Sequence, residues 1–366
     1  MGAVGGKMGG SLILEFKPWH GLLGGLAMGL AAGAKLLMSG RVLGISGALK
    51  GLLKGDFSMW RLCFLGGMAV GSLSLPGMLP DAFDKIPATY TIGRAAIGAL
   101  MVGLGSAIGN GCTSGHGICG NARLSVRSMA YTCTFMASGI LMATLAGTTA
   151  ALGISNVAAT YTAPTADSLA LSYKVLGATA TSLSAAAALG FAGRKLGLNK
   201  TKVGANMCDV VNGFVEAVAG VTFAVALGLS GMVRPTKVAG FLSMLAPSRD
   251  FSLMFVMGGA LLVATPLIQW ALYRNGRGEP PFCAKKYELP ASKAVDQTLL
   301  TGGVLFGAGW GICGACPGPI LVNLVVDPTV INVTLGAALM AGMILADKVV
   351  LPRLNSGGCK LTEKVK

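Results

Sequence analysis

The stretch IGALMVGLGSAIGNGC at residues 97–112 returns as TGGVLFGAGWGICGAC at residues 301–316, at an offset of 204 residues. Three glycines, one isoleucine and the last cysteine recur at equivalent positions, so that Cys112 corresponds to Cys316. Chance explains such a match poorly. The sequence therefore predicts an internal repeat, with one copy in each half of the chain.

The composition is that of a membrane protein. Of 366 residues, 53% are hydrophobic and 12% are charged, whereas roughly a quarter of the residues in a soluble domain are charged. The apolar residues form blocks about as long as a helix needs to cross a bilayer, which excludes a soluble globular enzyme. The net charge of +15 would suggest nucleic acid in a soluble chain. Here the basic residues lie in loops between apolar blocks, so we expect a lipid bilayer and no nucleic acid as partner.

Nine apolar blocks predict an all-α, polytopic membrane protein with about nine transmembrane helices. The blocks lie near residues 19–38, 57–76, 91–109, 129–152, 175–193, 207–231, 251–273, 298–315 and 329–350. Four crossings fall in each half, so the single crossing at 175–193 turns the second half upside down. We therefore predict an inverted repeat with a first transmembrane repeat at 1–152, a linker with a connecting transmembrane helix at 153–206, and a second transmembrane repeat at 207–366.

The charge of the loops predicts the orientation. With nine crossings, the loops on the side away from the N-terminus carry most of the Lys and Arg residues. The positive-inside rule then places the N-terminus outside and the Lys-rich C-terminus in the cytoplasm. A plasma or inner membrane is the expected location of this multi-pass protein.

Four shorter segments contain Gly or Pro and have a polar entry, and none is long enough to span a bilayer. They are residues 41–53, 111–121, 232–245 and 317–326. Non-helical backbone survives in lipid only where it is buried in protein or lines a cavity. We therefore expect short re-entrant hairpins that dip toward each other and bring Cys112 and Cys316 to one path.

Four short runs carry a resemblance to a known family. They are Gly-Arg-x3-Ile-Ser-Gly at 40–47, Gly-Cys-Thr-Ser-Gly-His-Gly at 111–117, Ala-Arg-Leu-Ser at 122–125 and Cys-Pro-Gly-Pro at 316–319. On these runs the chain resembles the YeeE/YedE sulphur-transport family. The second half looks like the companion protein that prokaryotes often encode separately, so that both halves are fused in one chain.

The resemblance implies a transporter, and not an enzyme, that takes up thiosulphate or a related small sulphur-containing anion. Cysteines lining a central path would contact the substrate in turn, and Cys112 and Cys316 match the cysteines of the family motifs. The other substrate-binding residues that we expect are Thr113, Ser114, Gly115, His116, Arg41, Ser46, Pro317 and Gly318. Thiosulphate and a cytoplasmic sulphur-accepting protein are the expected partners, and no metal or cofactor is expected.

The chemistry of these side chains agrees with that function. A thiol is a soft group and a weak donor, so it binds a terminal sulphur atom briefly without trapping it. Sulphate lacks such a soft atom. Arg41, Arg123, Arg127 and the N-termini of the hairpin helices would attract the negative charge, and no covalent step is required.

Two other functions fit some of the same cysteines. The pair Cys313 and Cys316 has the C-x-x-C spacing of a redox couple and would suit a membrane thiol-redox or sulphur-transfer enzyme. The same pair with Cys112, His116 and Cys119 would suit a zinc-like cluster, but the spacing is not diagnostic and four ligands would have to converge. The roles of Cys119 and Cys313 stay open at this point.

Two further side chains have both a structural and a functional interpretation. His116 has glycine on both sides, and a hydrogen-bonded brace of its hairpin is favoured over a ligand or a proton carrier. Glu216 lies in the middle of a predicted span, where an unpaired carboxylate is costly. It is a candidate for proton coupling, but we favour a salt bridge with Lys35, Arg61 or Arg94, because these bases would otherwise lack partners.

Overall fold

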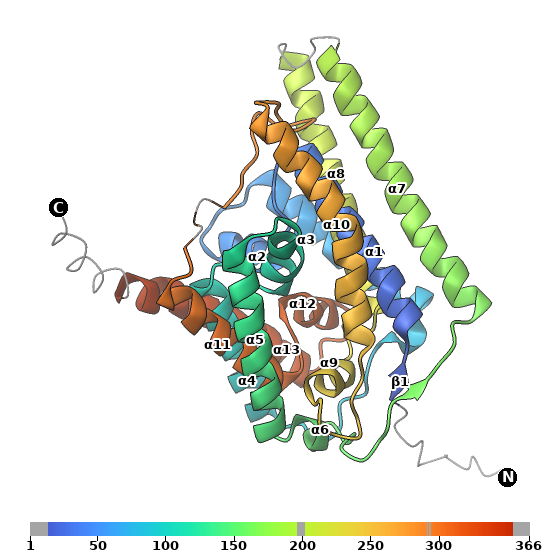
Figure 1. Cartoon of the computed structure of the whole chain (residues 1–366), viewed down its shortest axis with the longest axis vertical. Coiled ribbons are helices and arrows are strands. Elements are labelled where there is room, and N and C mark those ends of the chain that lie inside the picture. Colours follow the sequence, from blue (N-terminus) through green and yellow to red (C-terminus); the bar gives the residue numbers. More distant parts are fainter. Residues whose placement is uncertain (1–13, 196–201, 291, 293, 354–366) are drawn as a thin grey trace.

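The computed structural model describes residues 14–195, 202–290, 292 and 294–353, and these residues are mostly helical (Figure 1). The one sheet in this part of the chain pairs β1 (Glu15–Phe16) with β2 (Thr160–Tyr161) in parallel. The predicted all-α fold is therefore confirmed.

Long helices occupy all nine predicted crossings. They are α1 (Pro18–Ser39), α3 (Met59–Met78), α4 (Ile92–Ile108), α5 (Val126–Leu145), α7 (Ala166–Lys195), α8 (Lys202–Leu229), α10 (Ser252–Gly276), α11 (Gln297–Cys313) and α13 (Val330–Leu345). Each apolar block forms a helix because a helix satisfies its own backbone hydrogen bonds, as lipid requires.

Length and apolarity identify a polytopic membrane protein. Within the described residues, seven segments are long and apolar enough to cross a bilayer. One of them, Gln297–Val326, joins α11 to the short helix α12 (Pro317–Val326). An eighth results if α4 is joined to the π-helix η2 (Thr113–Gly120), which is bent from it by 48°. Helix α3 is not among these segments, and the total of nine crossings stays a prediction.

Short helices form where the sequence predicts re-entrant hairpins. They are α2 (Ile45–Leu53), η2, α9 (Pro235–Leu242) and α12. Figure 1 shows α12 near the centre of the long helices. Smaller elements in the connections are η1 (Pro80–Ala82) and α6 (Thr148–Ala151), and η4 (Ala346–Val350) continues α13.

Helix packing is reciprocal between the two halves. Helix α1 packs along α10, and its counterpart α8 packs along α3. Likewise, α5 packs along α11, and its counterpart α13 packs along α4. The pairs α4–α11 and α1–α8 join corresponding helices directly. This pattern supports two related halves, while the division into 1–152, 153–206 and 207–366 and the inverted orientation stay predictions. The connecting helix α7 lies at the edge, against α1 and α8 (Figure 1).

The same backbone turn interrupts both halves. Asn110 has a φ of 57° and Gly314 a φ of 68°, and the two positions are separated by the repeat offset. Both residues are in the left-handed conformation, which glycine and asparagine adopt at least cost. Two residues after each turn, Cys112 and Cys316 occupy the N-cap positions of η2 and α12. The turns therefore break the helices beside the two cysteines.

A buried ion pair joins α1 to α8. Lys35 Nζ lies 2.5 Å from Glu216 Oε2, and the two side chains are 1% and 0% exposed. The Ser39 hydroxyl donates to the other carboxylate oxygen over 3.0 Å. The salt bridge predicted for Glu216 is confirmed, and the alternative bases Arg61 and Arg94 have other partners.

Removing one member of this pair should destabilise the protein strongly. In Lys35→Met the Glu216 carboxylate would stay buried without its cation, at a cost of about 3–5 kcal/mol. We expect the double variant Lys35→Met, Glu216→Gln to recover most of this loss, because neither residue is then charged. Thermal unfolding of the detergent-solubilised protein measures both variants.

Lys54→Met is the matched control for this prediction. The Lys54 side chain is 50% exposed in its ion pair with Asp347, so its removal should cost at most about 1 kcal/mol. Equal losses of stability in Lys35→Met and Lys54→Met would contradict the prediction.

Candidate functional site

The two repeat-related cysteines line one cavity of about 380 Å³, here named the thiol cavity. Cys112, Thr113 and Ser114 line it from the first half, and Cys316 and Gly318 line it from the second. Both cysteines are buried, with exposed fractions of 1% and 4%. The long helices α1, α5, α8, α10 and α11 supply most of the remaining wall.

Hydrogen bonds connect three short helices at the thiol cavity. The Thr113 hydroxyl donates to Cys316 Sγ over 3.4 Å and so links η2 to α12. Ser114 Oγ lies 3.2 Å from Cys112 Sγ and accepts from the Ile45 N–H at 3.4 Å, which brings in the start of α2. The first turns of α2, η2 and α12 therefore converge. Since a helix N-terminus carries a partial positive charge, this arrangement favours an anion.

The rest of the wall is apolar and rich in sulphur. Five methionines line the cavity: Met28, Met136, Met232, Met254 and Met257. Thioethers and thiols are soft, polarisable groups. Among the described residues, no Lys, Arg, Asp or Glu lines the cavity. The site thus combines soft side chains with the positive ends of helices.

His116 supports the break beside Cys112. Its ring nitrogens lie 3.0 Å from Ser128 Oγ and 3.1 Å from the Gly109 carbonyl oxygen. Its ring packs on Tyr131, with centroids 4.3 Å apart. The predicted role as a hairpin brace is confirmed. Both nitrogens are used within the protein, and a contact of His116 with substrate stays a prediction.

The other predicted site residues lie at two places. Gly115, Ser46 and Pro317 are next in sequence to residues of the cavity wall but do not line it themselves. Arg41 lies in a separate cavity of about 950 Å³, where it pairs with Glu288 over 3.3 Å. Substrate binding by these residues stays a prediction.

Arg123 and Arg127 also lie away from the thiol cavity. Arg127 pairs with Asp296 over 3.1 Å, and Arg123 Nε donates to the Cys119 carbonyl oxygen over 3.3 Å. Any attraction that these two cations exert on an anion in the cavity therefore acts without direct contact.

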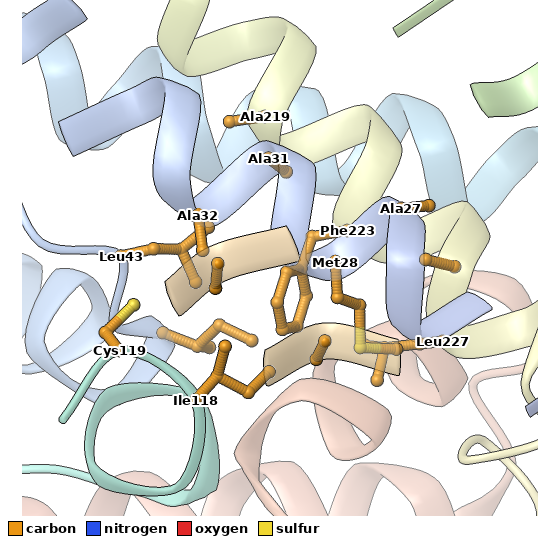
Figure 2. Close-up of a cluster of buried hydrophobic side chains, with 14 of the residues drawn as sticks. Ala27, Met28, Ala31, Ala32, Leu43, Ile118, Cys119, Ala219, Phe223 and Leu227 are labelled. Atoms are coloured by element: carbon orange, nitrogen blue, oxygen red, sulfur yellow. The ribbon is translucent and has the colours of Figure 1, made fainter. Parts of the chain in front are cut away.

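Cys119 and Cys313 are buried outside the thiol cavity. Figure 2 shows Cys119 among apolar side chains, near Leu43 and Ile118. The Cys313 thiol donates to the Ala315 carbonyl oxygen over 3.4 Å. Apolar packing therefore accounts for the position of the Cys119 thiol, and a local hydrogen bond accounts for that of the Cys313 thiol.

The zinc-like cluster considered from the sequence does not form. In the described part of the chain, no group of three or more His, Cys, Asp or Glu side chains is placed to hold a metal ion. His116 uses both ring nitrogens, and Cys119 packs in a separate apolar cluster.

Sequence reasoning missed Trp310 and the methionines of the wall. Trp310, from α11, lines the thiol cavity and packs against Phe135 and Phe241. It lies in the repeated stretch at the position that Ser106 holds in the first copy, but eleven of the sixteen positions differ between the copies, so this difference does not single it out. The chain has 18 methionines, and no sequence signal separates the five in the wall from the rest.

Two family comparisons together cover most of the chain. The sulphur transport family matches residues 7–142. A family of unknown function matches residues 211–356. The first match contains α1 to α4 and most of α5, with Cys112, and the second contains most of α8 and all of α9 to α13, with Cys316.

Curated relatives of part of the chain are named as transporters. A probable transporter of Xylella fastidiosa strain Temecula1 is 40% identical over 129 residues, which are 35% of this chain and 95% of that protein. A probable transporter of strain 9a5c is 38% identical over 143 residues, which are 38% of this chain and 93% of that protein. No solved structure matches the chain significantly. The chain belongs to the sulphur transport family, as its motifs predict.

Proposed function

We propose that the chain is a membrane transporter that takes up thiosulphate, or a related small sulphur-containing anion, along a path lined by Cys112 and Cys316. The observation that carries the proposal is that these repeat-related, buried thiols line one cavity, with the Thr113 hydroxyl bonded to Cys316. Membership of the sulphur transport family and the probable transporters among the relatives support the transporter class.

The proposed substrate has two different ends, and each has a counterpart in the cavity. The soft terminal sulphur of thiosulphate suits the thiols and thioethers of the wall. The charged, oxygen-bearing end suits the three converging helix N-termini. Sulphate offers only oxygens and gains nothing from the thiols. Because the wall holds no side-chain cation, binding stays weak enough for release.

Larger cavities flank the thiol cavity and supply the rest of the proposed route. One, of about 610 Å³, is lined by basic residues that include Lys17, Arg234 and Lys237. The other is the cavity of about 950 Å³ that holds Arg41 and Lys285. Lys17, Arg234, Lys237 and Arg41 each pair with a carboxylate, so these side chains attract an anion only weakly.

A short turn separates the thiol cavity from each of its neighbours. Residues 228–231 line the cavity of about 610 Å³, while Leu227 and Met232 beside them line the thiol cavity. On the other side, Arg41 lines the cavity of about 950 Å³ and Ile45 lines the thiol cavity. We infer that these two turns move alternately to admit and release the anion.

The proposed direction rests on the charge of the loops. With the N-terminus outside and the C-terminus in the cytoplasm, the cavity beside Lys17 faces outward and the cavity beside Arg41 faces the cytoplasm. Thiosulphate would enter by the first and leave by the second. A cytoplasmic sulphur-accepting protein would receive it there, at a plasma or inner membrane.

Uptake of labelled thiosulphate into proteoliposomes tests the proposal. We expect flux to fall roughly 10-fold or more in Cys112→Ala and in Cys316→Ala, as the loss of a contact of about 1.4 kcal/mol predicts. Cys313→Ala is the matched control, because Cys313 shares the C-x-x-C motif but lies outside the cavity. It should retain uptake.

A thiol-redox or sulphur-transfer enzyme is the competing function, and it would need both cysteines of the motif. Loss of function in Cys313→Ala, together with chemical turnover in detergent, would favour the enzyme. Unchanged uptake in both Cys112→Ala and Cys316→Ala would refute the thiol-lined path.

Thiol modification gives an independent measurement. A small maleimide should modify Cys112 and Cys316 faster than Cys119 and Cys313, because only the first two of these four line the cavity. Saturating thiosulphate should slow the modification of Cys112 and Cys316. Cys133, which is exposed on α5, is the internal control, and its rate should not change. Peptide mass spectrometry measures the rates, and an absence of protection at both cavity thiols would count against substrate binding there.

A further inference from the structure

The thiol cavity reaches the surface of the molecule between α5 and α10. Thr132 and Met136 of α5 line it, as do Met254, Met257 and Gly258 of α10. Met254 is 55% exposed and Gly258 is exposed as well, whereas the two thiols of the cavity are buried. The cavity therefore opens sideways between these five residues, and this gap is here named the side opening.

The packing of the helices leaves this side of the cavity without a cover. Helices α5 and α10 both pack against η2 and α9, but in the described part of the chain they are not among the helix pairs that pack along one another. Figure 1 shows α12 between them. Their counterparts α13 and α3 contribute no described residue to the wall of the thiol cavity. The side opening thus occurs on one side only of two related halves.

The side opening lies in an uncharged part of two spanning helices. Both α5 and α10 are long and apolar enough to cross a bilayer. Residues 128–145 and 252–273 contain no Lys, Arg, Asp or Glu, and the exposed side chains near the opening include Met129, Phe255 and Leu262. Such a surface on a spanning helix faces hydrocarbon. The molecules next to the side opening are therefore the acyl chains of lipids.

The cavity suits a thin and flexible apolar occupant. Three of the five residues of the side opening are methionines, whose flexible side chains adapt to irregular partners. Farther along the wall, Phe223 and Leu227 of α8 continue the apolar surface, and Figure 2 shows them near Met28 and Ile118 of the same wall. A helix of a second copy, about 10 Å across, could cover the side opening but is too thick to enter a cavity of about 380 Å³.

We propose that an acyl chain of a bilayer phospholipid enters the side opening and completes the wall of the thiol cavity. The chain passes Met257 and Gly258 and reaches Phe223 and Leu227. Hydrocarbon in the side opening keeps an anion in the cavity from leaving sideways, because an unpaired charge is costly in that medium. The inference goes beyond the proposed function and does not depend on which anion is transported.

A phospholipid with a photoreactive diazirine at the end of one acyl chain tests the proposal. The full chain is reconstituted into phosphatidylcholine vesicles that contain this lipid and is illuminated, and peptide mass spectrometry then maps the labelled residues. We expect label on Phe223 and Leu227. Both side chains are 2% exposed and residues 222–229 are all buried, so an acyl chain reaches these two residues only through the cavity that they line.

The variant Gly258→Leu should block the route. A Cβ atom at Gly258 meets no other atom within 4 Å, so a leucine fits there without a clash and fills the side opening. We expect label on Phe223 and Leu227 to fall about 10-fold, which corresponds to a loss of about 1.4 kcal/mol in binding of the chain.

Gly66→Leu is the matched control. Gly66 begins the Gly-Gly pair of α3 that corresponds to Gly258 and Gly259. It is also exposed and has open space at its Cβ position, but it does not line the thiol cavity. Label on Phe223 and Leu227 should equal that of the native chain.

Label confined to outward-facing residues such as Leu262, with none on Phe223 or Leu227 in the native chain, would overturn the proposal. Cross-linking of two chains through Cys133, which is exposed on α5, would in that case assign the side opening to a second copy. Equal label in Gly258→Leu and the native chain would exclude entry between α5 and α10. The native chain alone decides whether an acyl chain enters, even if Gly258→Leu folds poorly.

Discussion

Non-helical backbone beside the thiol cavity imposes the constraint on which the rest of the structure depends. Within hydrocarbon, free N–H and C=O groups find no water, so an interrupted helix survives only inside other protein elements. The breaks after α4 and α11 are enclosed in this way, because α13 packs along α4 and α5 packs along α11. His116 bonds the Gly109 carbonyl oxygen, and the Tyr131 hydroxyl donates to the Gly111 carbonyl oxygen over 3.3 Å. These side chains satisfy acceptors that the break releases.

The distribution of charge follows from the same constraint. Two pairs of full charges are buried among the helices, Lys35 with Glu216 and Lys237 with Asp250, and both pairs lie outside the thiol cavity. Pairing is what makes a buried charge tolerable in such a place. An anion in the cavity therefore meets helix ends, each worth about half an elementary charge, in place of full cations. Such partial charges suit the proposed function, in which the cavity has to release the anion that it binds.

The parts of the structure that sequence could predict are those governed by local rules. Apolar length located the long helices, because crossing a bilayer requires a fixed length of helix. The repeat offset brought Cys112 and Cys316 together, because the same left-handed turn precedes both. Arg41 was assigned on a motif, and the structure places it in another cavity with Glu288. That contact joins residues 247 positions apart, and no local pattern near Arg41 indicates it.

The two turns that border the thiol cavity are held with unequal strength. On one side, Arg41 pairs with Glu288 over 3.3 Å, and the carboxylate side chain is 51% exposed. On the other side, Arg234 pairs with Asp84 over 2.7 Å, the Asp84 side chain is 4% exposed, and the Thr236 N–H and hydroxyl also donate to it. Solvent screens the first pair far more than the second. The link at Arg234, which the predicted orientation places outside, is therefore the more costly of the two ion pairs to break.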